Sequence, residues 1–352
     1  MKLLLKLALS AAALLPLGCG ESVQLDAASQ ELLGQILTQV QVAPLAVAHT
    51  GNRRVEFHWH GDLSGDPAGG SAPQSFVYRE RVEIDGQGRF DLRTTQLMSN
   101  APINWPQFQL QQDIRAGFYQ RYRDVQFRDI ALVIENFTVA AFGNLLAVAG
   151  RPAVGLQLVR KIGEPIRHDL AIDAQTGLVL SARTSGGDGA LLAWMEYESI
   201  EMGAPATMTP HTFSNDEVVL PPGRELDAVL GFSADLPGIL PDGYHLLATA
   251  KIEDPAGHIW LKATYTDGID VAFYVTRPKS QSLAVATAAS GAWGTFGVSN
   301  PGTSAGPEPH LTTIRIAGIQ LLQGETEGRH VITLGRLPLE DLQWMVESVF
   351  DG

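Results

Sequence analysis

The sequence predicts an α+β fold in two domains, each built on an antiparallel sheet. Much of the chain alternates apolar and polar side chains with a period of two, which is typical of strands with one buried and one wet face. Helical spacing of apolar residues is confined to three stretches, near the start, at residues 106–122 and at the end. Residues 206–221, rich in Pro, Thr and small side chains, indicate a linker. We therefore expect one domain at residues 25–205 and a smaller one at 222–352.

The first domain is expected to begin with a helix and to continue as strands. The apolar face of that helix comprises Leu32, Leu33, Ile36, Leu37 and Val40. The stretch VEFHWH at residues 55–60 alternates, and FVYRERVEID at 76–85 returns as its partner strand, with Asp85-Gly86 as the turn into a third strand. Further strands are expected at residues 137–142, 153–161, 168–173, 177–185 and 192–202.

The second domain is expected to be a sheet closed by a C-terminal helix. Alternating stretches lie at residues 240–254, 258–268, 270–278, 291–298, 312–325 and 329–336. The helix follows in LPLEDLQWMVESVF, whose apolar face comprises Leu339, Leu342, Met345, Val346 and Val349.

Residues 1–18 have the pattern of an export signal. Lys2 and Lys6 give a positive start, residues 7–15 form an apolar run broken only by Ser10, and Gly18 is a small residue before the expected cut. The run is too short to span a bilayer as a permanent helix. We therefore expect an exported protein whose signal peptide is removed.

Cys19, the single cysteine of the chain, follows this leader directly. Its position resembles the bacterial lipobox, in which the thiol is diacylated and the cysteine becomes the new N-terminus. Gly20 in the next position favours the outer membrane, so the protein is expected in the cell envelope, anchored there and facing the periplasm. The alternative is an ordinary signal peptide with an incidental cysteine. With one cysteine, neither an internal disulfide nor a cysteine–zinc framework can form.

The charge of the chain argues against several partners. The formal net charge is −13, and it becomes −15 after removal of the leader, which carries Lys2 and Lys6 and no acid. Nucleic acids attract cationic surfaces, so no nucleic-acid partner is expected. Electrostatic adhesion to anionic membranes is disfavoured for the same reason, which leaves a lipid on Cys19 as the expected membrane attachment.

Residue patterns for catalysis and metal binding are weak. His58 and His60 share a side of their strand with Asp62 just beyond, but a tetrahedral metal site needs further ligands, and a wet strand face explains the pair. The chain has no Gly-x-Ser-x-Gly, His-Glu-x-x-His or phosphate-loop motif. We therefore expect no enzyme, no metal and no cofactor, with an uncharacterised enzyme as the last alternative.

Aromatic side chains on the strands of the first domain admit two interpretations. They could form a plain packed core, or they could line an apolar pocket for an acyl chain, because ligand pockets are concave and mostly apolar. The residues concerned are Phe57, Trp59, Phe76, Tyr78, Phe90 and Trp194.

Several stretches resemble the RseB/MucB family of periplasmic sigma-factor regulators. They are FVYRERVEIDGQGRF, AVAGRPAVGLQLVRK with HDLAIDAQTGLVLSARTS, LPDGYHLLATAKIED with YTDGIDVAFYV, and HVITLGRLPLEDLQWMVESV. The resemblance implies a LolA-like half-barrel as the larger domain, followed by a smaller sheet domain. It also implies a role in envelope-stress signalling through an anti-sigma factor or another envelope protein. A LolA-like carrier or sensor of lipids or lipoproteins, with an acyl-chain ligand, is the alternative function.

Overall fold

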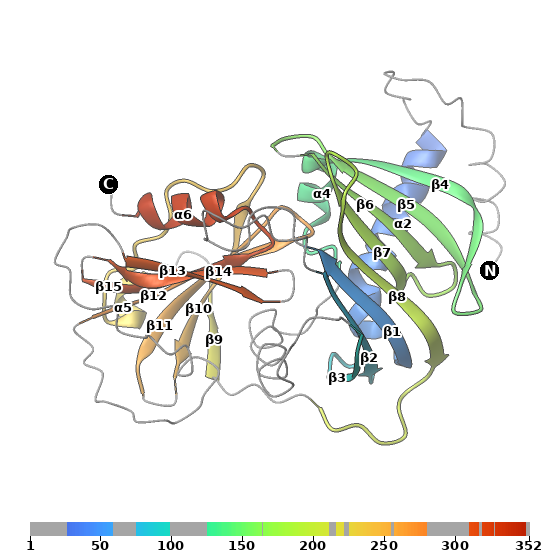
Figure 1. Cartoon of the computed structure of the whole chain (residues 1–352), viewed down its shortest axis with the longest axis horizontal. Helices are drawn as coiled ribbons and strands as arrows, with labels where there is room; N and C mark the ends of the chain where they lie inside the picture. The colour runs from blue at the N-terminus through green and yellow to red at the C-terminus, as the bar shows by residue number, and fades with distance from the viewer. Residues whose placement is uncertain are drawn as a thin grey trace. The chain divides into compact units, whose positions relative to one another are not determined.

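The computed structural model describes residues 27–58, 75–98, 125–163, 165–210, 216–221, 225–254, 257–279, 310–316, 319–326 and 328–349. The chain forms two compact units: unit 1 comprises residues 1–102 and 124–211, and unit 2 comprises residues 103–123 and 212–352. Both are built on antiparallel sheets with few helices (Figure 1), which confirms the predicted α+β class. The predicted leader, Cys19, the helix at 106–122 and the strand at 291–298 lie outside the described residues.

Unit 1 contains an eight-stranded sheet in the order β3-β2-β1-β8-β7-β6-β5-β4. Its helices are α2 (Ala27–Ala46) and α4 (Ile130–Asn136). The strands are β1 (His49–His58), β2 (Ser75–Ile84), β3 (Phe90–Leu97), β4 (Phe137–Val148), β5 (Arg151–Arg160), β6 (Ile166–Asp173), β7 (Val179–Gly186) and β8 (Leu191–Met202). The predicted strands are therefore confirmed, and β1 lies in the interior of the sheet, between β2 and β8.

Helix α2 crosses one face of this sheet (Figure 1). Its predicted apolar face is buried where described, with Ile36, Leu37 and Val40 at 0–3 % exposure. Two turns, at Gly177 and at Gly86, pack closely against α2. A Cβ added to Gly177 would lie 2.8 Å from the Cβ of Gln39, and one added to Gly86 would lie 3.0 Å from the Ala46 carbonyl oxygen. Both glycines have positive φ, so they give tight turns and close approach at once.

Helix α4 is not among the predicted elements. Asp129 caps it, because its carboxylate accepts hydrogen bonds from the backbone N–H groups of Ala131 and Leu132. Seven residues make fewer than two turns, which is too short for a periodic apolar pattern to stand out in the sequence.

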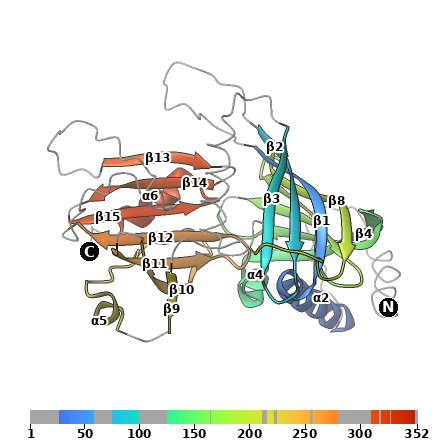
Figure 2. The same cartoon turned by 90° about the horizontal axis from the view of Figure 1, so that it is seen from below.

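Unit 2 contains a seven-stranded sheet in the order β13-β14-β15-β12-β11-β10-β9 (Figure 2). Its strands are β9 (Asp216–Leu220), β10 (His245–Glu253), β11 (Ile259–Thr266), β12 (Val271–Pro278), β13 (His310–Ile316), β14 (Ile319–Thr326) and β15 (Arg329–Gly335), and its helices are α5 (Leu226–Leu230) and α6 (Leu339–Glu347). The stretch 312–325, predicted as one strand, is the hairpin of β13 and β14. Strand β9 lies within the predicted linker, at an edge where it pairs with β10 alone.

The predicted C-terminal helix packs on one face of this sheet as α6. Leu342, Met345 and Val346 are fully buried there, against a cluster that includes Tyr265 and Tyr274. Burying each of these aliphatic side chains contributes about 1.5–3 kcal/mol, so this contact is a main source of stability for unit 2. Among the helices that the structure describes, none is long and apolar enough to cross a membrane.

Candidate functional site

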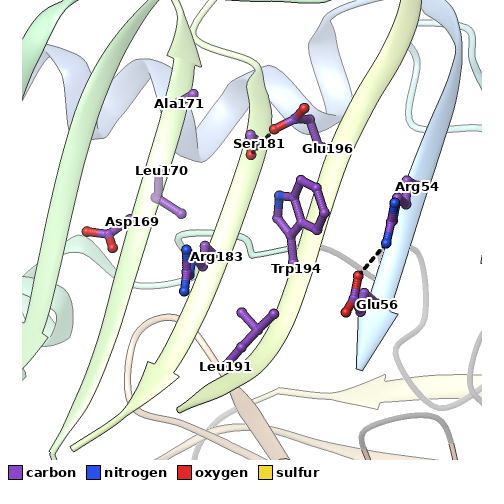
Figure 3. Close-up of a pocket in the computed structure, with 10 residues that line it drawn as sticks. All are labelled: Arg54, Glu56, Asp169, Leu170, Ala171, Ser181, Arg183, Leu191, Trp194 and Glu196. Atoms are coloured by element: carbon purple, nitrogen blue, oxygen red, sulfur yellow. Dashed lines mark hydrogen bonds and ion pairs between the residues drawn. The ribbon is translucent and has the colours of Figure 1, made fainter. Parts of the chain in front are cut away.

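A groove lies on the face of the unit 1 sheet turned away from α2 (Figure 3). It has a volume of about 570 Å³. In Figure 3 the pale blue helix runs behind the strands, and the groove side chains stand in front of them. The lining residues come from β1, β6, β7 and β8 and are Arg54, Glu56, Asp169, Leu170, Ala171, Ser181, Arg183, Leu191, Trp194 and Glu196. We call this surface the outer groove.

Strand register brings these residues together in two neighbouring rows. The first row runs across the sheet through Asp169, Arg183, Trp194 and Glu56, each directly opposite the next. The second row runs through Ala171, Ser181, Glu196 and Arg54 in the same way. Side chains directly opposite one another share a face of the sheet, so both rows project into the outer groove.

One side of the outer groove is held in place by a chain of contacts on β1. The guanidinium carbon of Arg54 lies 5.1 Å from the ring centroid of Trp194, a cation–π contact that covers one side of the indole. Arg54 Nη2 donates to Glu56 Oε2 at 2.9 Å, and Glu56 Oε1 lies 2.6 Å from His58 Nε2. Glu56 is thus occupied on both oxygens, and Trp194 is oriented before any ligand arrives.

The other acids of the outer groove are also hydrogen-bonded. Asp169 accepts from Gln157 Nε2 at 3.0 Å and from Arg167 Nε at 2.9 Å. Glu196 accepts from the Ser181 hydroxyl at 3.1 Å, its one contact among the described residues. Asp169 is therefore neutralised by an arginine outside the outer groove, whereas Glu196 keeps room for another donor.

Arg183 is the cation of the outer groove that has no counter-ion within the described part of the chain. Its side chain is exposed on β7, directly opposite Trp194 on β8 and Asp169 on β6. An arginine presents five N–H donors in a planar fork that matches a carboxylate. Beside it, Trp194 and Leu191 supply apolar surface. The arrangement can therefore bind a group that combines a carboxylate with an apolar body.

The outer groove lacks the arrangement expected of a hydrolase. None of the described residues that line it is a His, Cys or Lys, and Ser181 donates directly to Glu196. No three His, Cys, Asp or Glu side chains gather as metal ligands in the described ranges. Of the histidines weighed as ligands, His58 bonds to Glu56, whereas His60 and Asp62 lie outside the described residues.

The structure separates the aromatic residues that the sequence grouped in one pocket. Phe57, Tyr78 and Phe90 are buried at 0–5 % exposure, and the rings of Phe57 and Tyr78 lie 6.4 Å apart. Trp194 lies on the opposite face, because it is opposite Glu56, the neighbour of Phe57 along β1. The grouping of Trp194 with Phe57 therefore needs correction. Phe76 lies opposite Phe57 on β2, its side chain is not among those described, and Trp59 lies outside the described residues.

The sheet architecture and the outer groove together define a two-unit antiparallel α+β protein with a groove on its larger sheet. No protein-family model and no curated protein match the chain. Among solved structures it is similar to MucB in complex with MucA(peri), with a TM-score of 0.47 and 16 % identity over 90 % of this chain and 97 % of that one. It is similar to the Pseudomonas aeruginosa MucA/MucB complex (TM-score 0.45, 16 % identity, 88 % and 95 % covered) and to MucB alone (0.45, 17 %, 90 % and 96 %). MucB belongs to the family that the sequence stretches resemble.

Proposed function

We propose that this chain is an exported binding protein that recognises a segment of a partner polypeptide through the outer groove. The observation that carries the proposal is the exposed guanidinium of Arg183, without a counter-ion in the described residues, beside an indole already oriented by Arg54. An indole held in one orientation in a concave site loses little freedom when a ligand binds, which favours recognition.

The partner that the sequence resemblance favours is the periplasmic part of a membrane-bound anti-sigma factor. In that role the protein regulates envelope-stress signalling by holding its partner. The support is the set of similar stretches, which extends over most of residues 30–350. The acyl-ligand alternative stays a prediction. The close packing of Phe57, Tyr78 and Phe90, aromatic residues on the sheet face that α2 covers, does not favour it, since all three are 0–5 % exposed.

Anchoring to the outer membrane through Cys19 belongs to the same proposal. It rests on the leader pattern and on Gly20 after the cysteine. Metabolic labelling with a palmitate analogue tests it: the wild-type chain should carry the label and fractionate with outer membranes, and Cys19→Ser should lose both. Label that persists in Cys19→Ser would contradict the anchor.

Partner recognition is tested by capture from the source cells. The full chain, tagged at its C-terminus, is cross-linked in the cells and purified, with Trp194→Ala to remove the indole of the outer groove and Arg93→Gln as a control. Arg93 is an exposed arginine of edge strand β3 that does not line the groove. We expect one single-pass membrane protein with the wild type and Arg93→Gln, and a loss of at least about tenfold with Trp194→Ala, the order of a hot-spot truncation. Recovery of lipids alone, or capture that Trp194→Ala leaves unchanged, would refute the proposal.

A further inference from the structure

We propose that the outer groove selects an acidic side chain followed two positions later by an aliphatic one, in an extended segment of the partner. The carboxylate binds Arg183, and the aliphatic side chain packs against Trp194 and Leu191. This inference rests on the proposed function, since it names the chemistry of the partner segment.

The charges around the outer groove indicate that the ligand group at Arg183 is a carboxylate. Of its two guanidinium groups, Arg54 is bound to Glu56, whereas Arg183 has no acid bound to it among the described residues. The three acids of the groove, Glu56, Asp169 and Glu196, already accept hydrogen bonds. Two charges of the groove therefore have no ion pair among the described residues, the Arg183 guanidinium and the Glu196 carboxylate, and of the two only Arg183 attracts an acid. A single ligand carboxylate can form an ion pair with Arg183, whereas a second carboxylate nearby is repelled by Glu196.

Trp194 provides the contact for the apolar part of the ligand. One side of its indole is covered by Arg54 at 5.1 Å, and Trp194 lies between Arg54 on one side and Arg183 and Leu191 on the other (Figure 3). Because Arg183 and Trp194 lie directly opposite each other on paired strands, their Cβ atoms are about 5 Å apart. An apolar group next to a bound carboxylate therefore reaches the indole or Leu191.

The dimensions of the site favour an extended peptide. In extended chain, residues i and i+2 point to the same side and lie about 6.7 Å apart. Along β7, Ser185 lies two residues beyond Arg183 and directly opposite Leu191. A segment running along the strands can thus place its acid at Arg183 and the side chain two positions later at Leu191, beside Trp194. The cavity of about 570 Å³ suits a few residues rather than a whole domain.

Fluorine NMR with 5-fluorotryptophan tests the inference directly. The chain contains six tryptophans, and the signal that disappears in Trp194→Phe belongs to Trp194. The probe is the blocked pentapeptide Gly-Glu-Ser-Leu-Gly, and the matched control peptides carry Gln in place of Glu or Ser in place of Leu. We expect the Glu–Leu probe to shift the Trp194 signal, and the Gln peptide to bind about tenfold more weakly, as loss of a charge-assisted hydrogen bond predicts.

Variants assign that preference to Arg183. In Arg183→Gln the Glu and Gln peptides should bind equally weakly, Arg183→Lys should keep part of the difference, and Arg93→Gln should keep all of it. The inference fails if the Trp194 signal does not move, if Glu and Gln peptides bind alike to the wild type, or if Arg183→Gln still prefers Glu. A signal that moves with an oligouronate and not with the peptide would replace the peptide by an acidic sugar and would also overturn it.

The two proposals can fail separately. If Trp194→Ala loses the captured partner but Arg183→Gln keeps it and shows no change with the peptides, partner recognition stands and acid selection fails. If the peptides bind through Arg183 but no membrane protein is captured, the outer groove has the inferred chemistry and the proposed function fails.

Discussion

Arg53 and Glu80 lie directly opposite each other on β1 and β2 and form an ion pair of 2.7 Å, with side chains 1 % and 0 % exposed. The pair lies on the α2 face, among the apolar side chains of unit 1, with the Arg53 guanidinium 5.7 Å from the ring centroid of Tyr197. A charge at such a depth is tolerated only with its partner, so the pair selects the register of the two strands as well as their contact.

Removing one member of this pair should be far more damaging than breaking an exposed one. Glu80→Gln takes the negative charge from beside a buried guanidinium, and we expect the free energy of unfolding to fall by about 3 kcal/mol or more. The matched control is Glu198→Gln, which breaks the Arg79–Glu198 pair of 2.8 Å, whose side chains are 40 % and 37 % exposed. That loss should stay below about 1 kcal/mol. Urea unfolding of both variants measures the difference, and equal losses would contradict it.

Two glycine-to-alanine changes should have opposite signs. A Cβ at Gly51 would lie 2.6 Å from the ring of Tyr197 and 2.9 Å from the Ser199 carbonyl oxygen, so Gly51→Ala must displace a buried ring or the backbone of β8. A Cβ at Gly34, inside α2, meets no atom of the described residues outside its own helix backbone within 4 Å, and alanine there favours the helix by about 0.5–1 kcal/mol. We therefore expect a lower melting temperature for Gly51→Ala and a higher one for Gly34→Ala. A stabilised Gly51→Ala would show that the ring moves freely.

In unit 2, the two halves of the Lys262–Glu217 pair should not be equivalent. The atoms Nζ and Oε2 lie 3.1 Å apart, but the lysine side chain is 1 % exposed and the glutamate 17 %. Burial lowers the pKa of Lys262, although Glu217 works against this. Glu217→Gln leaves the ammonium without that counter-charge and should cost about 3 kcal/mol, whereas Lys262→Met leaves an acid that reaches water and should cost less. The order of the two urea midpoints tests this, and the reverse order would contradict it.

His330 on β15 should make unit 2 less stable in mild acid. Burial lowers its pKa below 6.5, helped by the nearby charges of Arg277, Lys279 and His258 and opposed by Glu325. Below pH 6.5 the unfolded chain therefore binds a proton that the folded chain does not, so the free energy of unfolding decreases, by at most about 1.4 kcal/mol per pH unit. Above pH 6.5 this contribution is constant.

Comparison with His330→Gln isolates this effect. The difference in unfolding free energy between wild type and variant should be constant from pH 8 to about 6.5 and should shift in favour of the variant below it. Parallel curves down to pH 5 would show that the folded and unfolded chains bind the proton alike.

The elements that could be predicted from the sequence are those whose own periodicity is long enough to show. Helix α2 follows from its apolar face and β6 and β7 from alternation, because burial of one face imposes the pattern. Helix α4 and strand β9 have seven and five residues, and their placement depends on a cap at Asp129 and on pairing with β10. Such short segments carry too little pattern of their own.

The outer groove could not be derived in the same way. Alternation along β8 places Trp194 and Tyr197, three positions later, on opposite faces, and this is the one local signal that separates Trp194 from the aromatic residues of the core. The importance of Arg183 depends on its neighbours, Trp194 and Asp169, which come from different strands. These residues come together only when the strands pair in the correct register across the whole sheet. No short stretch of the sequence specifies that pairing.

The place of β1 between β2 and β8 has a consequence for how a newly made chain acquires its structure. β1 finds its first neighbour, β2, soon after synthesis, but its second neighbour includes Tyr197, 148 positions beyond His49. Until β8 arrives, one edge of β1 is open to strands of other chains. Contacts of such long range form slowly, so assembly of this unit should be timed by the joining of its first and last strands.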